Sequence, residues 1–191
     1  MNVVALDPSL TATGWVAINL VTDQVVGAGV IRTEAPSAAE KKHASMAQLS
    51  AARGLVIQKG VRVALQRHQA ILVIQEGNAG SKSAKAAAML GRAQQACVSA
   101  VYSRTGGLPL FVTVQAAKKA AVGKTSASKE QVEAAIRKRW PSVPWELLLE
   151  GVAQSKRENA YDAASAYLAA YENPAVTSAR AQARLAAGLA V

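Results

Sequence analysis

The chain has 191 residues, the size of one ordinary domain, and 42 of them are alanine. Lys and Arg number 22 against 12 Asp and Glu, which gives a net charge of +10 and an isoelectric point of about 10.1. No run of about 20 strongly apolar residues argues for a membrane span, and no basic leader precedes the first apolar stretch. The single cysteine, Cys97, excludes an internal disulfide framework and a cysteine-rich zinc site. We therefore expect a cytoplasmic protein that binds a polyanion, with nucleic acid the leading candidate and mere solubility the alternative use of the charge.

Three short apolar segments near the N-terminus predict strands. They cover residues 3–6, 15–18 and 24–33, are rich in Val and Ile, and are separated by Asp, Gly, Pro or Thr. This pattern favours an antiparallel meander. Residues 37–68 then predict one helix, with Gly54 and Gly60 as weak points.

The rest of the chain alternates strands and helices. Residues 71–74 form a continuous apolar run, typical of a strand buried on both faces, and residues 110–114 predict a fifth strand. Helices are expected over 81–104, 128–140 and 156–171, with mixed helix and loop after Lys118 and a short turn or helix at Pro144-Trp145. The order indicates an α/β fold with a five-stranded mixed sheet flanked by helices. We expect one domain over residues 1–173 and an Ala/Arg-rich tail over 174–191 that is helical or frayed.

Two acidic residues stand directly at the ends of predicted strands. Asp7 follows the first apolar run and Glu76 follows the fourth. Burying a lone carboxylate is costly unless it is paired, hydrogen-bonded or metal-bound, and strand ends are where α/β folds place their sites. The plain alternatives are a turn cap for Asp7 and an exposed loop for Glu76. Most other acids, including Asp23, lie in polar contexts and are interpreted as solvated.

A second acidic pair lies in the last predicted helix. Glu158 and Asp162 are four residues apart, so they share one helix face, where like charges destabilise an isolated helix. Small alanines surround them, which suits close packing against a sheet. Together with Asp7 and Glu76 they would form a carboxylate cluster of the kind that binds hard divalent cations. Two such ions activate water and stabilise the leaving oxygen in phosphodiester cleavage.

Four segments resemble motifs of the RuvC-type Holliday junction resolvases, in the order of that family. Residues 4–15 (VALDPSLTATGW) are similar to its first strand and turn, and residues 74–77 (IQEG) to the strand that ends in a catalytic glutamate. Residues 118–132 are close to its basic segment, and residues 161–164 (YDAA) to its final helix. The resemblance spans residues 3–170 and implies a ribonuclease H-like fold, a homodimer, and magnesium-dependent paired nicking of four-way DNA junctions.

The resemblance also assigns the acids. Asp7, Glu76 and Asp162 match three acids of the family's active site. The bacterial pattern has its fourth acid three residues before the last, where this chain has Asn159. Glu158 is therefore taken as the fourth acid, with Asn159 as a neutral alternative ligand. The four carboxylates would hold two Mg²⁺ ions, and the same oxygen donors accept Mn²⁺.

Basic residues are expected to complete the site and to contact the branched DNA. The resemblance places Lys118 and Lys129 near the scissile phosphate, where they would assist catalysis. The residues expected to bind phosphates are Lys82, Lys85, Arg92, Lys118, Lys119, Lys124, Lys129 and Arg137. Solvated helix faces are the alternative for these residues.

Several residues have a plainer interpretation. Met89, Leu90 and Ala93, on the same predicted helix as Lys85, are candidates for the dimer contact. His43 and His68 have no acidic or cysteine partner by spacing and are interpreted as surface residues, and Cys97 is interpreted as a core residue.

Other functions remain open from the sequence alone. A different ribonuclease H-like nuclease, acting on flaps, branched DNA or RNA–DNA hybrids, would use the same acids. An actin-like ATP-binding fold also begins with a strand, an Asp and a later Thr-Gly, but it needs two such domains. A junction-binding protein without catalysis would use the acids only as caps. The departures from the bacterial pattern suggest a phage or mobile-element enzyme, acting at the nucleoid of a bacterial or phage-infected cell.

Overall fold

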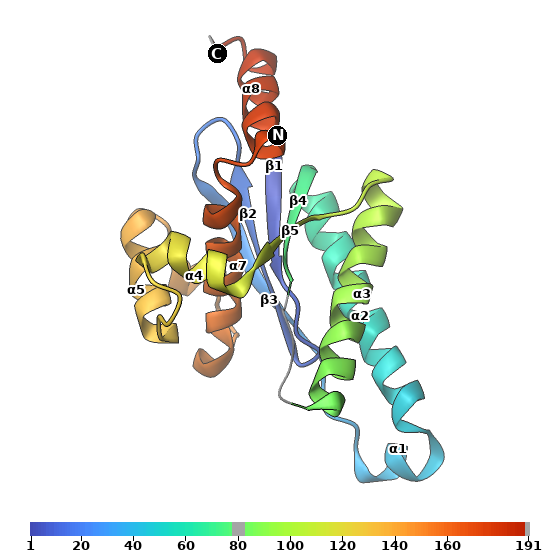
Figure 1. Ribbon diagram of the computed structural model, residues 1–191. Coiled ribbons are helices and arrows are strands. Elements are labelled where there is room, and N and C mark those ends of the chain that lie inside the picture. The colour runs from blue at the N-terminus through green and yellow to red at the C-terminus, as the bar shows by residue number, and fades with distance from the viewer. Residues whose placement is uncertain (78–82, 190–191) are drawn as a thin grey trace.

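The computed structural model describes residues 1–77 and 83–189, and within them a mixed five-stranded sheet lies between two layers of helices (Figure 1). The strands are β1 (Asn2–Asp7), β2 (Ala12–Asn19), β3 (Val25–Arg32), β4 (Ala70–Gly77) and β5 (Leu110–Thr113), in the spatial order β3-β2-β1-β4-β5. The first three strands pair antiparallel, whereas β4 pairs parallel with both β1 and β5. The predicted fold class, the N-terminal meander and the five strands are confirmed.

The helices of the described residues fall on both faces of the sheet. They are α1 (Ala38–His43), α2 (Met46–Arg67), α3 (Ala84–Thr105), α4 (Val114–Val122), α5 (Lys129–Arg139), α6 (Trp145–Leu148), α7 (Gln154–Ala170) and α8 (Pro174–Ala186). Figure 1 shows α2 and α3 against one face and α4, α5 and α7 on the other. None of the described helices is long and apolar enough to cross a membrane.

Successive side chains of β1 and β4 point to opposite faces of the sheet. Val4 and Leu6 pack into the core beneath α2 and α3, whereas Val3 and Ala5 pack into the core beneath α7. Asp7 continues the second series and so lies on the α7 face. Ile74 belongs to that same core, so Glu76, two residues later, also lies on the α7 face. The two carboxylates therefore emerge on one side of the sheet.

The predicted helix over 37–68 is wrong in one respect, because the chain forms two helices there. Ser45 caps a new helix by accepting a hydrogen bond from the Gln48 amide, and the Gln48 side chain accepts one from the Ser45 amide. Gly60 does not weaken α2, which runs through it. A Cβ at Gly60 would lie 2.8 Å from the Ile31 side chain, so the glycine lets α2 approach β3.

Two later boundaries also differ from the expectation. The fifth strand ends at Thr113, whose hydroxyl caps α4 by accepting a hydrogen bond from the Ala116 amide at 3.1 Å. A regular helix therefore begins before Lys118, where mixed structure was expected. In the tail, Asn173 caps α8, and Val176 and Ala183 are buried. The helical alternative for the tail thus holds over Pro174–Ala186.

The interpretation of His68 as a surface residue is wrong. His68 ends α2 and is half-buried against Trp15, with 5.2 Å between the ring centroids. Burial, with a smaller contribution from the charge of Arg67, lowers the pKa of the imidazole. His43 is exposed and Cys97 is buried, as expected.

Asp23 is not a solvated residue either. It occupies the turn between β2 and β3 with φ of 57°, and its carboxylate accepts a hydrogen bond from the Tyr167 hydroxyl at 2.6 Å. Its carbonyl accepts one from the Trp140 indole at 2.7 Å, and Arg139 forms an ion pair with its carboxylate. The turn therefore supplies hydrogen-bond acceptors for the hydroxyl and the indole N–H of two buried aromatic side chains. These contacts fasten the meander to α5 and α7.

Helix α7 crosses the sheet at very close range. Its contact face consists of buried alanines, among them Ala160, Ala163 and Ala164. On β2, a Cβ added at Gly14 would collide with the carbonyl of Asn159 and lie 2.8 Å from the Ala160 amide nitrogen. Because backbone meets backbone here, the height of α7 above the sheet is set by the absence of side chains.

Replacing Gly14 by Ala is expected to lower the free energy of unfolding by about 1–3 kcal/mol, since neither backbone segment can yield without moving α7. Gly91, within α3, has no atom within 4 Å of its added Cβ. Gly91→Ala should therefore leave stability unchanged or raise it by about 0.5–1 kcal/mol. Urea denaturation of both variants tests the contact, and a Gly14→Ala protein as stable as Gly91→Ala would contradict it.

Candidate active site

Asp7 and Glu76 end adjacent parallel strands and are almost completely buried. The register places Leu6 beside Gln75, so the residues that follow them come out side by side at one edge of the sheet. Asp7 is 8% exposed and Glu76 is 6% exposed. The expectation that both carboxylates stand at the ends of interior strands is confirmed.

Helix α7 brings Asp162 to the same edge. The contact of Gly14 with the backbone of α7 lies directly beside Asp7, because Gly14 is the β-sheet partner of Asp7. Asp162 stands one residue from the buried Tyr161 and is itself only partly exposed. The close approach of this helix thus places a third carboxylate among the first two.

Burial and neighbouring negative charge raise the pKa of all three carboxylates. Burial raises the pKa of Asp7 well above its usual value, and the charges of Glu76 and Asp162 add to this. Burial and the charge of Asp162 raise the pKa of Glu76 to about 7. Burial raises the pKa of Asp162 to about 6. Each of these carboxylates is therefore harder to ionise at this edge of the sheet than in water.

Two lysines oppose that charge from neighbouring helices. Lys118, on α4, donates a hydrogen bond to the Ala127 carbonyl at 2.9 Å, and its charge lowers the pKa of Glu76 and Asp162. Lys129, the first residue of α5, forms an ion pair with Glu158, and its charge acts on Asp7 and Asp162. The structure therefore brings both lysines to the acids.

The loop between β1 and β2 forms one wall of the site. The Thr13 hydroxyl donates to the Ser9 carbonyl at 2.8 Å and accepts from the Ser9 amide at 3.2 Å. From α2, the Arg53 guanidinium donates to the Leu10 carbonyl at 3.0 Å and to the Thr33 hydroxyl at 2.8 Å. The role of Arg53 could not be found in the sequence, because α2 is more than 40 residues away from the loop it supports.

A hollow of about 380 Å³ opens over Asp7 and Asp162. Its walls are loop residues 8–11, Lys129 and Asn159 on one side and Ala86, Met89 and Leu90 of α3 on the other. Glu158 lies outside this hollow and lines a neighbouring one with Lys129, Glu130 and Glu133. Of the two candidates for the fourth ligand, Asn159 thus faces the hollow and Glu158 faces Lys129.

The site has the donor chemistry of a divalent cation site without a ready-made triad. In the part of the chain that the structure describes, no three His, Cys, Asp or Glu side chains converge closely enough to hold one ion. The carboxylates of Asp7, Glu76 and Asp162 are nevertheless hard oxygen donors whose mutual repulsion a cation would relieve. On this ground the residues fit a divalent ion.

Comparison with known proteins identifies the family of this chain. The family model described as crossover junction endodeoxyribonuclease RuvC matches residues 3–140. The chain belongs to the RuvC family. Among solved structures, RuvC of Thermus thermophilus in complex with a Holliday junction substrate is similar with a TM-score of 0.63 and 21% identity, covering 88% of this chain and 92% of that one. A second structure of Thermus thermophilus RuvC has a TM-score of 0.62 and 20% identity, with 89% and 95% covered. No curated protein matched the sequence.

The predicted DNA-contacting residues of this RuvC-family protein differ in how far the structure leaves them available to DNA. Those that present an exposed side chain are Lys85, Arg92, Lys119, Lys124 and Lys129, while Lys118 is half-buried and Lys82 lies outside the described residues. Arg137, in contrast, is occupied by Glu133, Glu146 and Tyr161. Arg137 is therefore not available to bind a phosphate without giving up one of these partners. Met89 and Leu90 line the hollow, but Ala93 is fully buried and so cannot be a dimer contact.

The raised pKa of Glu76 predicts a pH-dependent stability. The folded-state pKa of about 7 lies above the usual 4.5, so the folded protein binds this proton more tightly than the unfolded chain. That stabilisation is complete below pH 4.5 and is lost as the pH rises through 7. Glu76→Gln should therefore be more stable than the wild type near pH 8, by on the order of 2 kcal/mol, with a smaller gain near pH 5.

Urea denaturation in metal-free buffer at the two pH values measures this difference. Exposed Glu34 supplies the control, because Glu34→Gln removes one carboxylate far from the buried set. A gain for Glu76→Gln that does not depend on pH would contradict the electrostatic origin.

Proposed function

We propose that this chain is a structure-selective endonuclease that resolves four-way DNA junctions by divalent-metal-dependent hydrolysis of phosphodiester bonds. The observation that carries the proposal is the set of three carboxylates with raised pKa at one edge of the sheet: the buried Asp7 and Glu76 and the partly exposed Asp162. A fold gains nothing in stability from such a set, so it is retained for chemistry. Membership of the RuvC family supplies the type of reaction.

The family is typically magnesium-dependent, and in this chain Asp7, Glu76 and Asp162 would hold the ions. Two Mg²⁺ ions, or Mn²⁺ in their place, would supply the activation of water and the stabilisation of the leaving oxygen. Glu158 is our proposed fourth acid, although its ion pair with Lys129 means that it must exchange partners to reach an ion.

The lysines bind the substrate at its reacting phosphate. Lys129 has a side chain that is 58% exposed at the rim of the hollow, and it is positioned to contact a phosphate oxygen beside Asp7. Lys118 is more buried and is held by the Ala127 carbonyl, so it acts through its charge. Two cations near the reacting group would stabilise the negative charge that develops there.

A wider basic surface would bind the arms of the junction. Lys85 and Arg92 are exposed on α3, the helix that forms one wall of the hollow, and Lys119 and Lys124 are exposed on and after α4. Each phosphate contact should add about one unit to the slope of log K against log salt. Paired nicking requires two sites, and one chain provides one, so we propose that the active form is a homodimer.

Cleavage assays on different substrates distinguish the four-way junction from the alternatives. Cleavage of labelled four-way, three-way, flap and RNA–DNA hybrid substrates, with and without Mg²⁺, should show a preference for the four-way junction that depends on the metal. Equal cleavage of the flap or the hybrid would make the protein a different ribonuclease H-like nuclease. Binding of the junction without cleavage in Mg²⁺ or Mn²⁺ would make it a binding protein.

Asp7→Asn, Glu76→Gln and Asp162→Asn should each abolish junction cleavage while leaving junction binding intact or tighter. The reason is that each change removes a metal ligand and a charge that repels phosphate, but none of the basic surface. Gel-shift titration beside a cleavage assay measures both effects. Parallel loss of binding and cleavage in a folded variant would instead assign these residues a structural role.

Glu158 and Asn159 are distinguished by substitution in the same assay. If Glu158 is a metal ligand, Glu158→Gln should lower the cleavage rate by orders of magnitude, on the scale of losing one catalytic carboxylate. Asn159→Ala should then cost far less. A Glu158→Gln protein with near-normal turnover at low Mg²⁺ would remove Glu158 from the site and leave three acids, with Asn159 as the residue that faces the hollow.

A further inference from the structure

We propose that Arg137 is a positioning residue, which together with Tyr161 holds α5 against α7 and thereby places Lys129 at the carboxylates. The inference rests on the proposed function, since it concerns the same cleavage reaction. It assigns an internal role to a residue that the sequence alone suggested for DNA contact.

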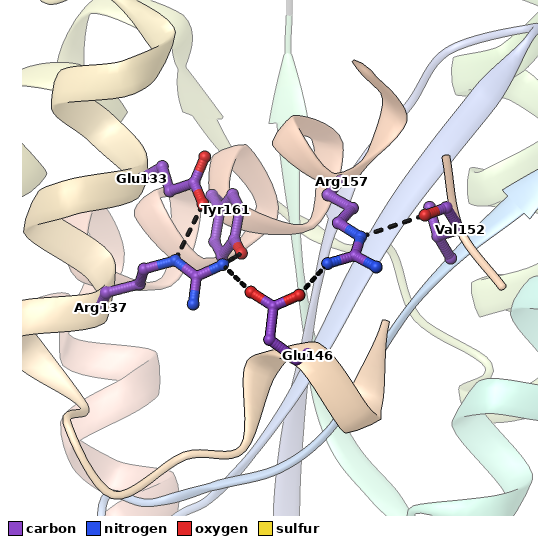
Figure 2. A network of polar contacts seen from close by, with 6 residues as sticks. All are labelled: Glu133, Arg137, Glu146, Val152, Arg157 and Tyr161. Atoms are coloured by element: carbon purple, nitrogen blue, oxygen red, sulfur yellow. Dashed lines mark hydrogen bonds and ion pairs between the residues drawn. The ribbon is translucent and has the colours of Figure 1, made fainter. Parts of the chain in front are cut away.

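Arg137 connects three helices through one side chain (Figure 2). Its Nε donates to Glu133 on the same helix at 2.8 Å. Its Nη2 donates to Glu146 of α6 at 2.7 Å and to the Tyr161 hydroxyl of α7 at 2.6 Å. The guanidinium also lies 5.3 Å from the centre of the Tyr161 ring. A planar fork with several fixed donors is suited to this task, and a lysine cannot reproduce it.

The far side of this network is fastened as well. Glu146 forms a second ion pair with Arg157 of α7, and Arg157 Nε donates a hydrogen bond to the Val152 carbonyl at 3.0 Å (Figure 2). Helix α6 is therefore held between α5 and α7 by one carboxylate with an arginine on each side. Trp145 adds an edge contact to the Tyr161 ring, with 5.2 Å between centroids.

The position of Tyr161 links this network to the acids. Tyr161 is 1% exposed and immediately precedes Asp162 in α7. At the other end of α5, Lys129 forms its ion pair with Glu158, which lies one turn before Asp162. Helix α5 is thus joined to α7 at both ends, about 12 Å apart along its axis. Between these contacts, Val132 and Ile136 of α5 are buried in the core that also contains Tyr161. Releasing the Arg137 end would leave this apolar packing and the exposed Lys129 ion pair, and would remove the polar contacts that fix the orientation of α5.

The charges and exposure of Arg137 support an internal role over a phosphate contact. Its side chain is 34% exposed, and two carboxylates already compensate its charge. A phosphate would have to displace one of these partners and leave a carboxylate facing the DNA. The adjacent Lys138 is exposed and forms no ion pair among the described residues, which makes it the matched control.

A double-mutant cycle between Arg137 and Lys129 tests the inference. In single-turnover cleavage of a four-way junction, Arg137→Gln should lower the rate about tenfold or more, because a small misplacement of a catalytic group is costly. Junction affinity and its salt slope should match those of Lys138→Gln. In a Lys129→Ala background, Arg137→Gln should cause no further loss, since the group that it positions is already absent. Arg137→Lys should behave like Arg137→Gln, and Tyr161→Phe should show a smaller loss of the same kind.

Two results would overturn the inference. Equal rate losses for Arg137→Gln in the presence and absence of Lys129 would show that Arg137 acts independently of it. A loss confined to affinity and salt slope would make Arg137 a phosphate contact after all.

Amide hydrogen exchange provides an arm that does not depend on cleavage. Arg137→Gln should speed exchange in the first turns of α5, around Lys129, relative to Lys138→Gln. Unchanged exchange there would overturn the positioning role. If the wild-type protein cleaves none of the substrates, the proposed function fails, and the exchange arm alone then decides whether Arg137 holds α5.

Discussion

Three carboxylates lie at one edge of the sheet, where burial and neighbouring charge make their ionised forms unfavourable. The rest of the structure has to offset this cost. Asp7 and Glu76 are carried there by the register of two parallel strands, and Asp162 by a helix that lies directly on the sheet. The surrounding elements make this arrangement tolerable: Lys118 and Lys129 bring opposite charge, and the cores on both faces supply the stabilisation that the site itself does not. Close packing of the rest of the fold therefore offsets the electrostatic cost of the site.

Much of the fold and of this site can be predicted from the sequence, because strand ends obey simple rules. Alternation and burial point to Asp7 and Glu76 from local pattern alone, and the helical spacing with Glu158 points to Asp162. The resemblance to the RuvC family adds the two lysines. The role of Arg137 could not be predicted in this way. Its partners Glu146 and Tyr161 are 9 and 24 residues distant, and only the packing of α5, α6 and α7 reveals them.

Charge counts overestimate the surface available to DNA for the same reason. The net charge of +10 treats every cation alike. In the structure, Arg139 serves the turn at Asp23, Arg53 supports the loop beside Asp7, and Arg157 holds Glu146. These arginines contribute to the architecture, whereas several of the exposed cations near the hollow are lysines. Arginine is suited to fixed internal geometry because its planar fork reaches several acceptors at once.

The contact between β2 and α7 has a further consequence for how this family member can change. At most packed positions, a larger residue on one side can be accommodated by a smaller one opposite. At Gly14 there is no side chain to remove, and the opposing atoms are the backbone of Asn159 and Ala160, which every residue type shares. No second substitution can therefore restore the fit. This point of the molecule has no compensatory route, and the helix that carries Asp162 is tied to a single permitted residue on the neighbouring strand.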